Sequence, residues 1–283
     1  MILHIETSTQ VCSVGLSREG EWLAVREDRS KNYSHSALLT VFMEEVMKEA
    51  AVTADEVDAV AVSRGPGSYT GLRIGVSAAK GFCYAMDIPL IAVDTLKALA
   101  VSTMAFVNFN PDNAVDNLSA SGAFARNEFP MTTKDPGGKR KASGDSTRSI
   151  PEEDRDPGVP PGRRVLWCPM IDARRMEVYY ALFTSDLEEV KSTAAEVITE
   201  QSFKQLLEHQ QVIFSGDGAE KCRQVIDSPN AVFVPDSLPS VGGMLSLAED
   251  QFKRKDFVDV AYFEPRYLKD FVAGKPKVKG LYS

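Results

Sequence analysis

Residues 63–75, SRGPGSYTGLRIG, predict the end of a strand, a tight glycine turn and the beginning of a helix. Ser68 or Thr70 is placed to cap this helix by accepting a backbone N–H bond. A glycine-rich turn ahead of a helix can also bind an anion. The stretch lacks the Gly-Lys-Ser/Thr ending of a P-loop and the GxGxxG pattern of a dinucleotide site. Phosphate binding and a purely structural turn therefore both remain open.

Apolar runs on both sides of this stretch predict an α/β fold. Strands are expected at residues 1–7, 11–16, 21–27, 59–63 and 90–93, and helices at 35–51, 70–86 and 95–104. A second, smaller α/β unit is expected beyond Val165, with strands at 165–168, 177–183, 211–215 and 231–234 and helices at 201–209 and 241–255. A turn is expected at residues 216–218.

The two units are separated by a long stretch without periodicity. It is rich in proline, glycine and serine and cannot bury enough apolar area to offset the entropy of ordering. The predicted organisation is therefore a first domain at 1–107, a disordered insertion at 108–164 and a smaller second domain at 165–283.

Composition excludes several classes of protein. The net charge of −8 argues against a surface that grips nucleic acid by itself. No apolar run approaches the ~18–20 residues that span a bilayer, and the beginning of the chain lacks the basic segment of a signal peptide. The four cysteines are far apart, which argues against a disulfide framework. We expect a cytoplasmic protein with buried thiols and no membrane contact.

Catalytic and metal-binding patterns are also missing from the sequence. His35 would need a second histidine four residues later to form a helical two-histidine site, and position 39 is Leu39. The stretch Gly65–Tyr69 does not fit the GxSxG pattern of a serine nucleophile. The sequence therefore predicts no catalytic residue and no metal site.

Small residues recur on one face of the helix expected at 70–86. Gly71, Gly75 and Ala79 lie at i, i+4 and i+8, and glycine inside a helix costs about 1 kcal/mol relative to alanine. Such a stripe permits close approach of another backbone, which belongs either to this chain or to a partner. Under the partner hypothesis, Gly75→Leu or Ala79→Arg is expected to abolish binding and leave the fold intact.

The helix expected at 35–51 supports the partner hypothesis. Its apolar arc is wider than the ~100° needed to cover a sheet, and surplus apolar surface commonly marks an interface. The predicted partner interface, drawn from both helices, consists of Leu38, Val41, Phe42, Gly71, Leu72, Gly75, Ala78, Ala79 and Phe82.

A second candidate site lies in the turn after the first strand. Glu6, Thr7, Ser8 and Thr9 combine an acid with three hydroxyls, a set that can meet a phosphate and its magnesium ion. The same residue types are also common in turn and capping chemistry.

Five segments in order resemble the TsaB (YeaZ) family of bacterial tRNA-modification proteins. They are residues 2–9, 12–16, 35–39, 64–75 and 172–179, the last reading DARRMEVY. The resemblance covers nearly the whole chain outside 108–164. It implies an actin-like ATPase and sugar-kinase (ASKHA, RNase H-like) fold of two domains, with the second domain reduced.

The resemblance also implies a function. In such systems one enzyme makes threonylcarbamoyl-adenylate from threonine, bicarbonate and ATP. The catalytic subunit TsaD then transfers the threonylcarbamoyl group to N6 of the adenosine 3′ of the anticodon. TsaB supports TsaD by binding it, and the small ATPase TsaE joins the complex. This chain would be a dimerisation or scaffold subunit that pairs with TsaD or with its own copy. It would reach tRNA only through the complex, while ATP and metal ion reside on partner subunits.

Two residues depart from the catalytic relatives of this family. The His-x-x-x-His metal pair of TsaD is reduced here to His35, because Leu39 occupies the second position. Relatives that hydrolyse ATP usually carry Asp at the first phosphate turn, where this chain has Glu6. Both departures favour a member without independent activity. The alternative is a small-molecule kinase or ATPase of the same fold.

Overall fold

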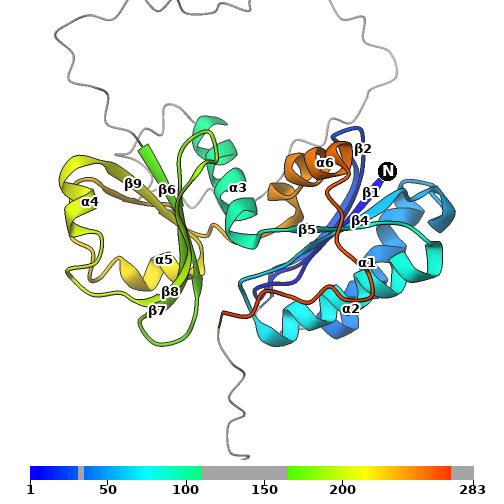
Figure 1. Cartoon of the computed structure of the whole chain (residues 1–283), viewed down its shortest axis with the longest axis horizontal. Helices are drawn as coiled ribbons and strands as arrows, with labels where there is room; N and C mark the ends of the chain where they lie inside the picture. Colours follow the sequence, from blue (N-terminus) through cyan, green and yellow to red (C-terminus); the bar gives the residue numbers. More distant parts are fainter. Residues whose placement is uncertain (31–34, 110–164, 269–283) are drawn as a thin grey trace, which may run out of the picture.

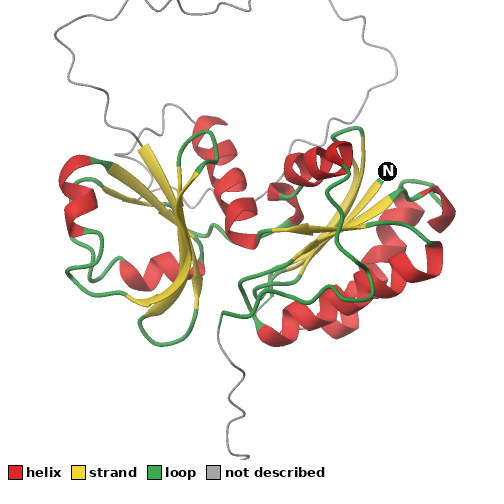
Figure 2. Cartoon of the chain, viewed as in Figure 1, coloured by secondary structure: helices red, strands yellow, loops and turns green. Residues whose placement is uncertain are grey.

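The computed structural model describes residues 1–30, 35–109 and 165–268. Most of the predicted insertion, residues 110–164, lies outside the described residues. The described chain forms two α/β units, each built around one five-stranded sheet (Figure 1). In Figure 2 helices lie on both sides of each sheet.

The first sheet has the strand order β3-β2-β1-β4-β5. Strands β1 (Ile2–Glu6), β2 (Cys12–Arg18) and β3 (Glu21–Asp28) form an antiparallel meander, and β4 (Ala59–Ser63) and β5 (Leu90–Val93) add in parallel to β1. The parallel crossovers contain α1 (His35–Glu49) with a short 3-10 turn, η1 (Ala54–Glu56), and α2 (Tyr69–Met86).

The second sheet repeats this topology with the order β10-β9-β6-β7-β8. Strands β6 (Val165–Asp172), β7 (Glu177–Phe183) and β8 (Glu189–Val197) form the meander, and β9 (Gln211–Ser215) and β10 (Ala231–Phe233) add in parallel. Its crossover helices, α4 (Lys204–His209) and α5 (Asp217–Cys222), have only 6 residues each. The same topology with shorter helices matches the predicted fold of two related domains, the second reduced.

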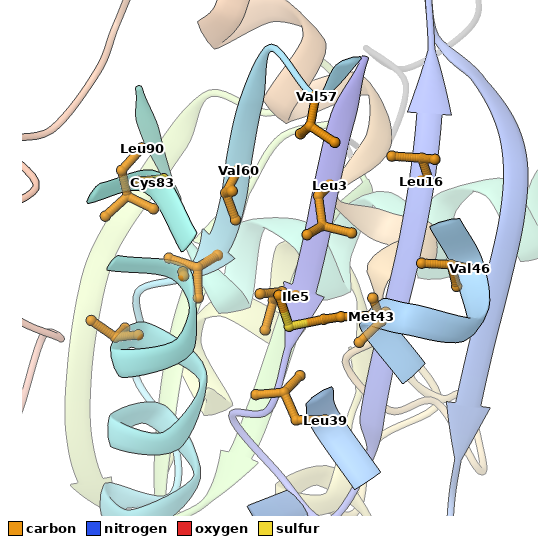
Figure 3. Close-up of a cluster of buried hydrophobic side chains, with 14 of the residues drawn as sticks. Leu3, Ile5, Leu16, Leu39, Met43, Val46, Val57, Val60, Cys83 and Leu90 are labelled. Atoms are coloured by element: carbon orange, nitrogen blue, oxygen red, sulfur yellow. The ribbon is translucent and has the colours of Figure 1, made fainter. Parts of the chain in front are cut away.

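Alternation along β1 builds the two faces of the first sheet, because successive side chains of a strand point to opposite faces. Leu3 and Ile5 lie in the cluster that packs under α1 and α2, where Leu39 and Met43 of α1 reach toward the sheet (Figure 3). Ile2 belongs to the cluster on the opposite face.

Two helices cross between the units. Helix α3 (Thr95–Phe109) follows the first sheet in sequence, yet Leu96 and Ala100 pack on the second sheet. Helix α6 (Leu245–Arg254), preceded by the 3-10 turn η4 (Val241–Gly243), returns to the first sheet, where Met244 and Ala248 join its buried cluster. The boundaries drawn at residues 107 and 165 stay a prediction, and the packing of the two units does not follow sequence order.

Crossing a bilayer takes a helix of about 20 mostly apolar residues, and this can be checked for the helices of the described ranges. None of them is long and apolar enough to do so.

Candidate docking site

The glycine-proline stretch that opens α2 forms the predicted strand, turn and helix. Ser68 caps the helix, because its side chain accepts a hydrogen bond from Gly71 N at 3.3 Å. The predicted cap at Ser68 is therefore confirmed. The turn presses on the loop after β1, which brings the two candidate sites of the sequence into contact.

The stripe of small residues on α2 faces this chain itself. A Cβ atom added to Gly71 would lie 2.1 Å from Thr7 O, and one added to Gly75 would lie 2.2 Å from Thr7 Oγ1. The Thr7 hydroxyl donates a hydrogen bond to Gly71 O at 2.8 Å. The close approach that the glycines permit is therefore made by the loop after β1.

This packing corrects the predicted interface for four residues. Leu72 and Ala79 are buried together with Gly71 and Gly75, so all four are covered by their own chain. Substitution of Gly75 or Ala79 cannot then be expected to spare the fold. The internal alternative, which the sequence left open, accounts for the stripe.

The other five predicted interface residues lie on α1 or α2 and are not fully buried. Leu38, Phe42, Ala78 and Phe82 are partly buried against the core cluster of the first sheet, and Val41 is 44% exposed. They stay candidates for partner contact.

A second stripe of small residues points outward from α2. Ser77, Gly81 and Ala85 are exposed and also lie at i, i+4 and i+8. A Cβ atom added to Gly81 would meet nothing within 4 Å. Beside them, the Tyr84 side chain is 86% exposed. Sequence reasoning missed these residues, because both stripes have the same spacing and only burial distinguishes them.

We call this surface the docking face. Helices α1 and α2 lie side by side on one side of the first sheet (Figure 1). The docking face consists of the exposed Val41, Ser77, Gly81, Tyr84 and Ala85 and the partly buried Leu38, Phe42, Ala78 and Phe82.

The candidate phosphate turn is closed. Glu6, Thr7 and Ser8 are fully buried, and Thr9 is 5% exposed. Ser8 O accepts a hydrogen bond from Ser68 N at 2.6 Å, and a Cβ atom on Gly67 would lie 2.3 Å from the same oxygen. A phosphate could reach these groups only if the glycine-proline turn moved away.

The Glu6 carboxyl is buried, and one of its two oxygens accepts a hydrogen bond. Its Oε1 accepts a hydrogen bond from Ser8 N at 2.6 Å, while Oε2 has no hydrogen-bond partner within residues 1–30, 35–109 and 165–268. Burial raises the pKa of this carboxyl above its ordinary value, because water no longer stabilises the charged form.

The Glu6 carboxyl is expected to make stability fall as pH rises. The folded state keeps its proton at pH values where the unfolded carboxyl, with a pKa near 4.5, is already ionised. Glu6→Gln removes this penalty, so we expect the variant to be more stable than the parent chain at pH 7. The gain should shrink to nothing below pH 4.5. Urea unfolding from pH 4 to pH 8 measures it, and a gain independent of pH would contradict the assignment.

The histidine predicted to lack a metal partner is buried in the core. His35 Nε2 lies 3.1 Å from Val11 O, and Leu39 is 1% exposed. Among the described residues no group of three or more His, Cys, Asp or Glu side chains is placed to hold a metal ion.

The DARRMEVY segment forms the hairpin between β6 and β7. Asp172 Oδ1 accepts a hydrogen bond from Arg174 N at 2.8 Å and also contacts Lys221 Nζ. Arg174 and Arg175 both have positive φ angles, of 74° and 53°. The acid of this segment therefore shapes a tight turn.

Known proteins resemble parts of this chain in sequence. Residues 29–115 match the family model "TsaD: tRNA N6-adenosine threonylcarbamoyltransferase". The Haemophilus influenzae "tRNA threonylcarbamoyladenosine biosynthesis protein TsaB" is 33% identical over 119 residues, which cover 42% of this chain and 49% of that protein. The Escherichia coli protein of the same name is 33% identical over 99 residues, covering 35% and 42%. Each of these two TsaB matches spans less than half of the length of the curated relative.

Solved structures resemble nearly the whole chain. One, titled "YeaZ from Pseudomonas aeruginosa", superposes with a TM-score of 0.66 at 21% identity and covers 94% of this chain and 99% of its own. A second Pseudomonas aeruginosa structure, titled as similar to peptidase YEAZ, gives 0.67 at 21% identity and covers 95% and 99%. These likenesses confirm the two-domain ASKHA-like fold.

Proposed function

We propose that this chain is a member of the TsaB (YeaZ) family and a non-catalytic subunit of a tRNA N6-threonylcarbamoyladenosine transferase complex. It would act by docking on a TsaD-type catalytic subunit and supporting that subunit while it modifies the adenosine 3′ of the anticodon. The proposal is carried by the docking face.

The docking face contains a glycine that the fold of this chain does not require. Gly81 lies inside α2, where glycine costs about 1 kcal/mol relative to alanine. The added Cβ atom would meet open space, so close packing within the described chain gives no reason for it. Close approach of a second helix would supply one, and the exposed Val41 and Tyr84 offer apolar contact beside it.

The closed turn at Glu6–Thr9 supports a complex in which this chain docks on its partner and other subunits bind the nucleotide. Ser8 O is already bonded to Ser68 N, so the groups that would receive a phosphate are engaged within the chain. We therefore place the nucleotide and metal chemistry of the complex on its partner subunits. TsaE would join as the ATPase, and tRNA would be held through the complex.

A second copy of this chain is an alternative occupant of the docking face. Because a homodimer and a TsaD heterodimer would use the same surface, the two assemblies would compete. We propose that the heterodimer is the working form.

Reconstitution tests the proposed function. A TsaD-type subunit, TsaE and the enzyme that makes threonylcarbamoyl-adenylate are incubated with tRNA, with and without this chain. Modified adenosine is measured by mass spectrometry of the digested tRNA. We expect modification to depend on the chain and the chain to co-elute with TsaD. Equal modification without it, or substrate-dependent ATP turnover by the chain alone, would overturn the proposal.

A further inference from the structure

The segment at 257–267 runs along α2 beside Tyr69, Arg73 and Lys80. Lys80 Nζ on α2 donates hydrogen bonds to Ala261 O and Phe263 O, both at 3.0 Å. Further along, Arg266 N donates to Arg64 O at 2.7 Å. These bonds fix the segment along the helix and anchor its end at the glycine-proline turn.

A cavity of about 360 Å³ lies between this segment and α2. Helix α2 contributes the polar side chains of Tyr69, Arg73 and Lys80. The facing segment contributes Phe263, Glu264 and Tyr267. The cavity therefore combines two cations, one carboxylate and three aromatic rings.

The Arg73 guanidinium is held in place yet keeps donors unused. Its Nη1 donates to Tyr69 Oη at 2.8 Å, and the guanidinium carbon lies 5.3 Å from the Tyr69 ring centroid. In the described part of the chain, no carboxylate forms a salt bridge with it. A guanidinium presents its N–H groups as a planar fork that matches a carboxylate.

The other residues that line the cavity favour a ligand that is mainly apolar and carries little charge. The ring centroids of Tyr69 and Tyr267 are 4.8 Å apart, and the planes of the two rings meet at 42°. Phe263 packs against the core cluster of the first sheet. Lys80 already donates two hydrogen bonds to backbone carbonyls, and the Glu264 carboxylate offsets part of the positive charge of the lining, which limits the negative charge that the cavity can accept. The Arg73 guanidinium beside the aromatic rings therefore suits a ligand with one negative charge and a planar or branched apolar group.

We propose that this cavity binds a carboxylate-bearing group. The carboxylate would pair with the free edge of Arg73, and the apolar body would pack against Phe263 and Tyr267. The group has two sources, a small aromatic or branched carboxylic acid, or an acidic side chain of a docked partner. The second source follows from Ser77, which lines the cavity and belongs to the docking face. The ligand chemistry itself does not depend on the proposed function.

The first arm of the test titrates sodium benzoate into the isolated full chain, followed by ¹⁵N–¹H NMR. We expect saturable shifts confined to α2 and residues 263–267, and at least tenfold weaker binding to Arg73→Gln. Arg254→Gln, at the end of the distant helix α6, is the matched control and should bind as the parent does. Inorganic phosphate should bind more weakly than benzoate.

The second arm measures the affinity of a TsaD-type subunit for the same variants. Loss of benzoate binding in Arg73→Gln identifies a small-molecule site. An unresponsive benzoate titration with a tenfold loss of partner affinity in Arg73→Gln identifies an acidic partner side chain. If Arg73→Gln changes neither measurement, the proposal is wrong. Gly81→Arg separates this outcome from failure of the proposed function, since it should block the partner and spare benzoate binding.

Discussion

Gly81→Arg is expected to weaken binding to a TsaD-type subunit by about 100-fold or more, the size of effect seen at interface hot spots. The arginine side chain would project from the centre of the docking face and keep a partner helix away from α2. Folding should be unaffected, because the added Cβ atom meets nothing within 4 Å. Isothermal titration calorimetry gives the affinity, and thermal unfolding gives the stability.

Gly81→Ala is the matched control for this prediction. Alanine is a better helix former, so the variant should be more stable by about 0.5–1 kcal/mol. The small methyl group should cost much less affinity than arginine does. If Gly81→Arg binds as tightly as the parent chain, the docking face lies elsewhere. Sedimentation of the same variants measures homodimerisation, which should weaken in parallel if both assemblies share this surface.

Gly75→Leu is expected to destabilise the chain severely, in contrast to Gly81→Arg only six residues away. Its Cβ atom would lie 2.2 Å from Thr7 Oγ1 and would displace the hydroxyl from Gly71 O. Overpacking typically costs about 1–3 kcal/mol, and an unsatisfied buried polar group costs about 1–3 kcal/mol more. Their sum is a large part of the roughly 5–15 kcal/mol that holds a domain together.

Urea unfolding and the yield of soluble protein measure this effect. Ser77→Leu provides the control on the same helix, because Ser77 is exposed and its substitution should change stability by less than about 0.5 kcal/mol. A Gly75→Leu chain as stable as the parent would mean that the loop after β1 does not pack on α2 as described. It would also restore Gly75 as a candidate for partner contact.

Local sequence patterns predicted most elements of the first unit. The apolar alternation in β1 predicts a strand, and the i, i+3, i+4 spacing in α1 predicts a helix. Each pattern also indicates which face of the element is buried. The same logic failed for the small residues of α2. A repeat of four residues indicates that a stripe exists, but Gly71–Gly75–Ala79 and Ser77–Gly81–Ala85 differ only in what lies opposite them.

The second unit was harder to predict for local reasons. Strand β8, Glu189–Val197, is a sheet-edge strand with a single buried residue, so it carries little apolar alternation. Helix α5 begins at Asp217, within the stretch Gly216–Gly218 whose residue types are typical of a turn, so the predicted turn is in fact the start of a short helix. The cavity beside Arg73 joins residues about 190 positions apart, and no local pattern links them.

The crossed packing of α3 and α6 has a consequence for how the protein is made. Ala61 and Ile91 belong to a face of the first sheet that is covered by Met244 and Ala248. During vectorial synthesis this face stays uncovered until Met244 and Ala248 have left the ribosome. A fragment cut between the units would therefore expose apolar surface on both pieces. Emergence of α6, rather than of the last strand of the first sheet, is therefore the event that allows this face to be buried.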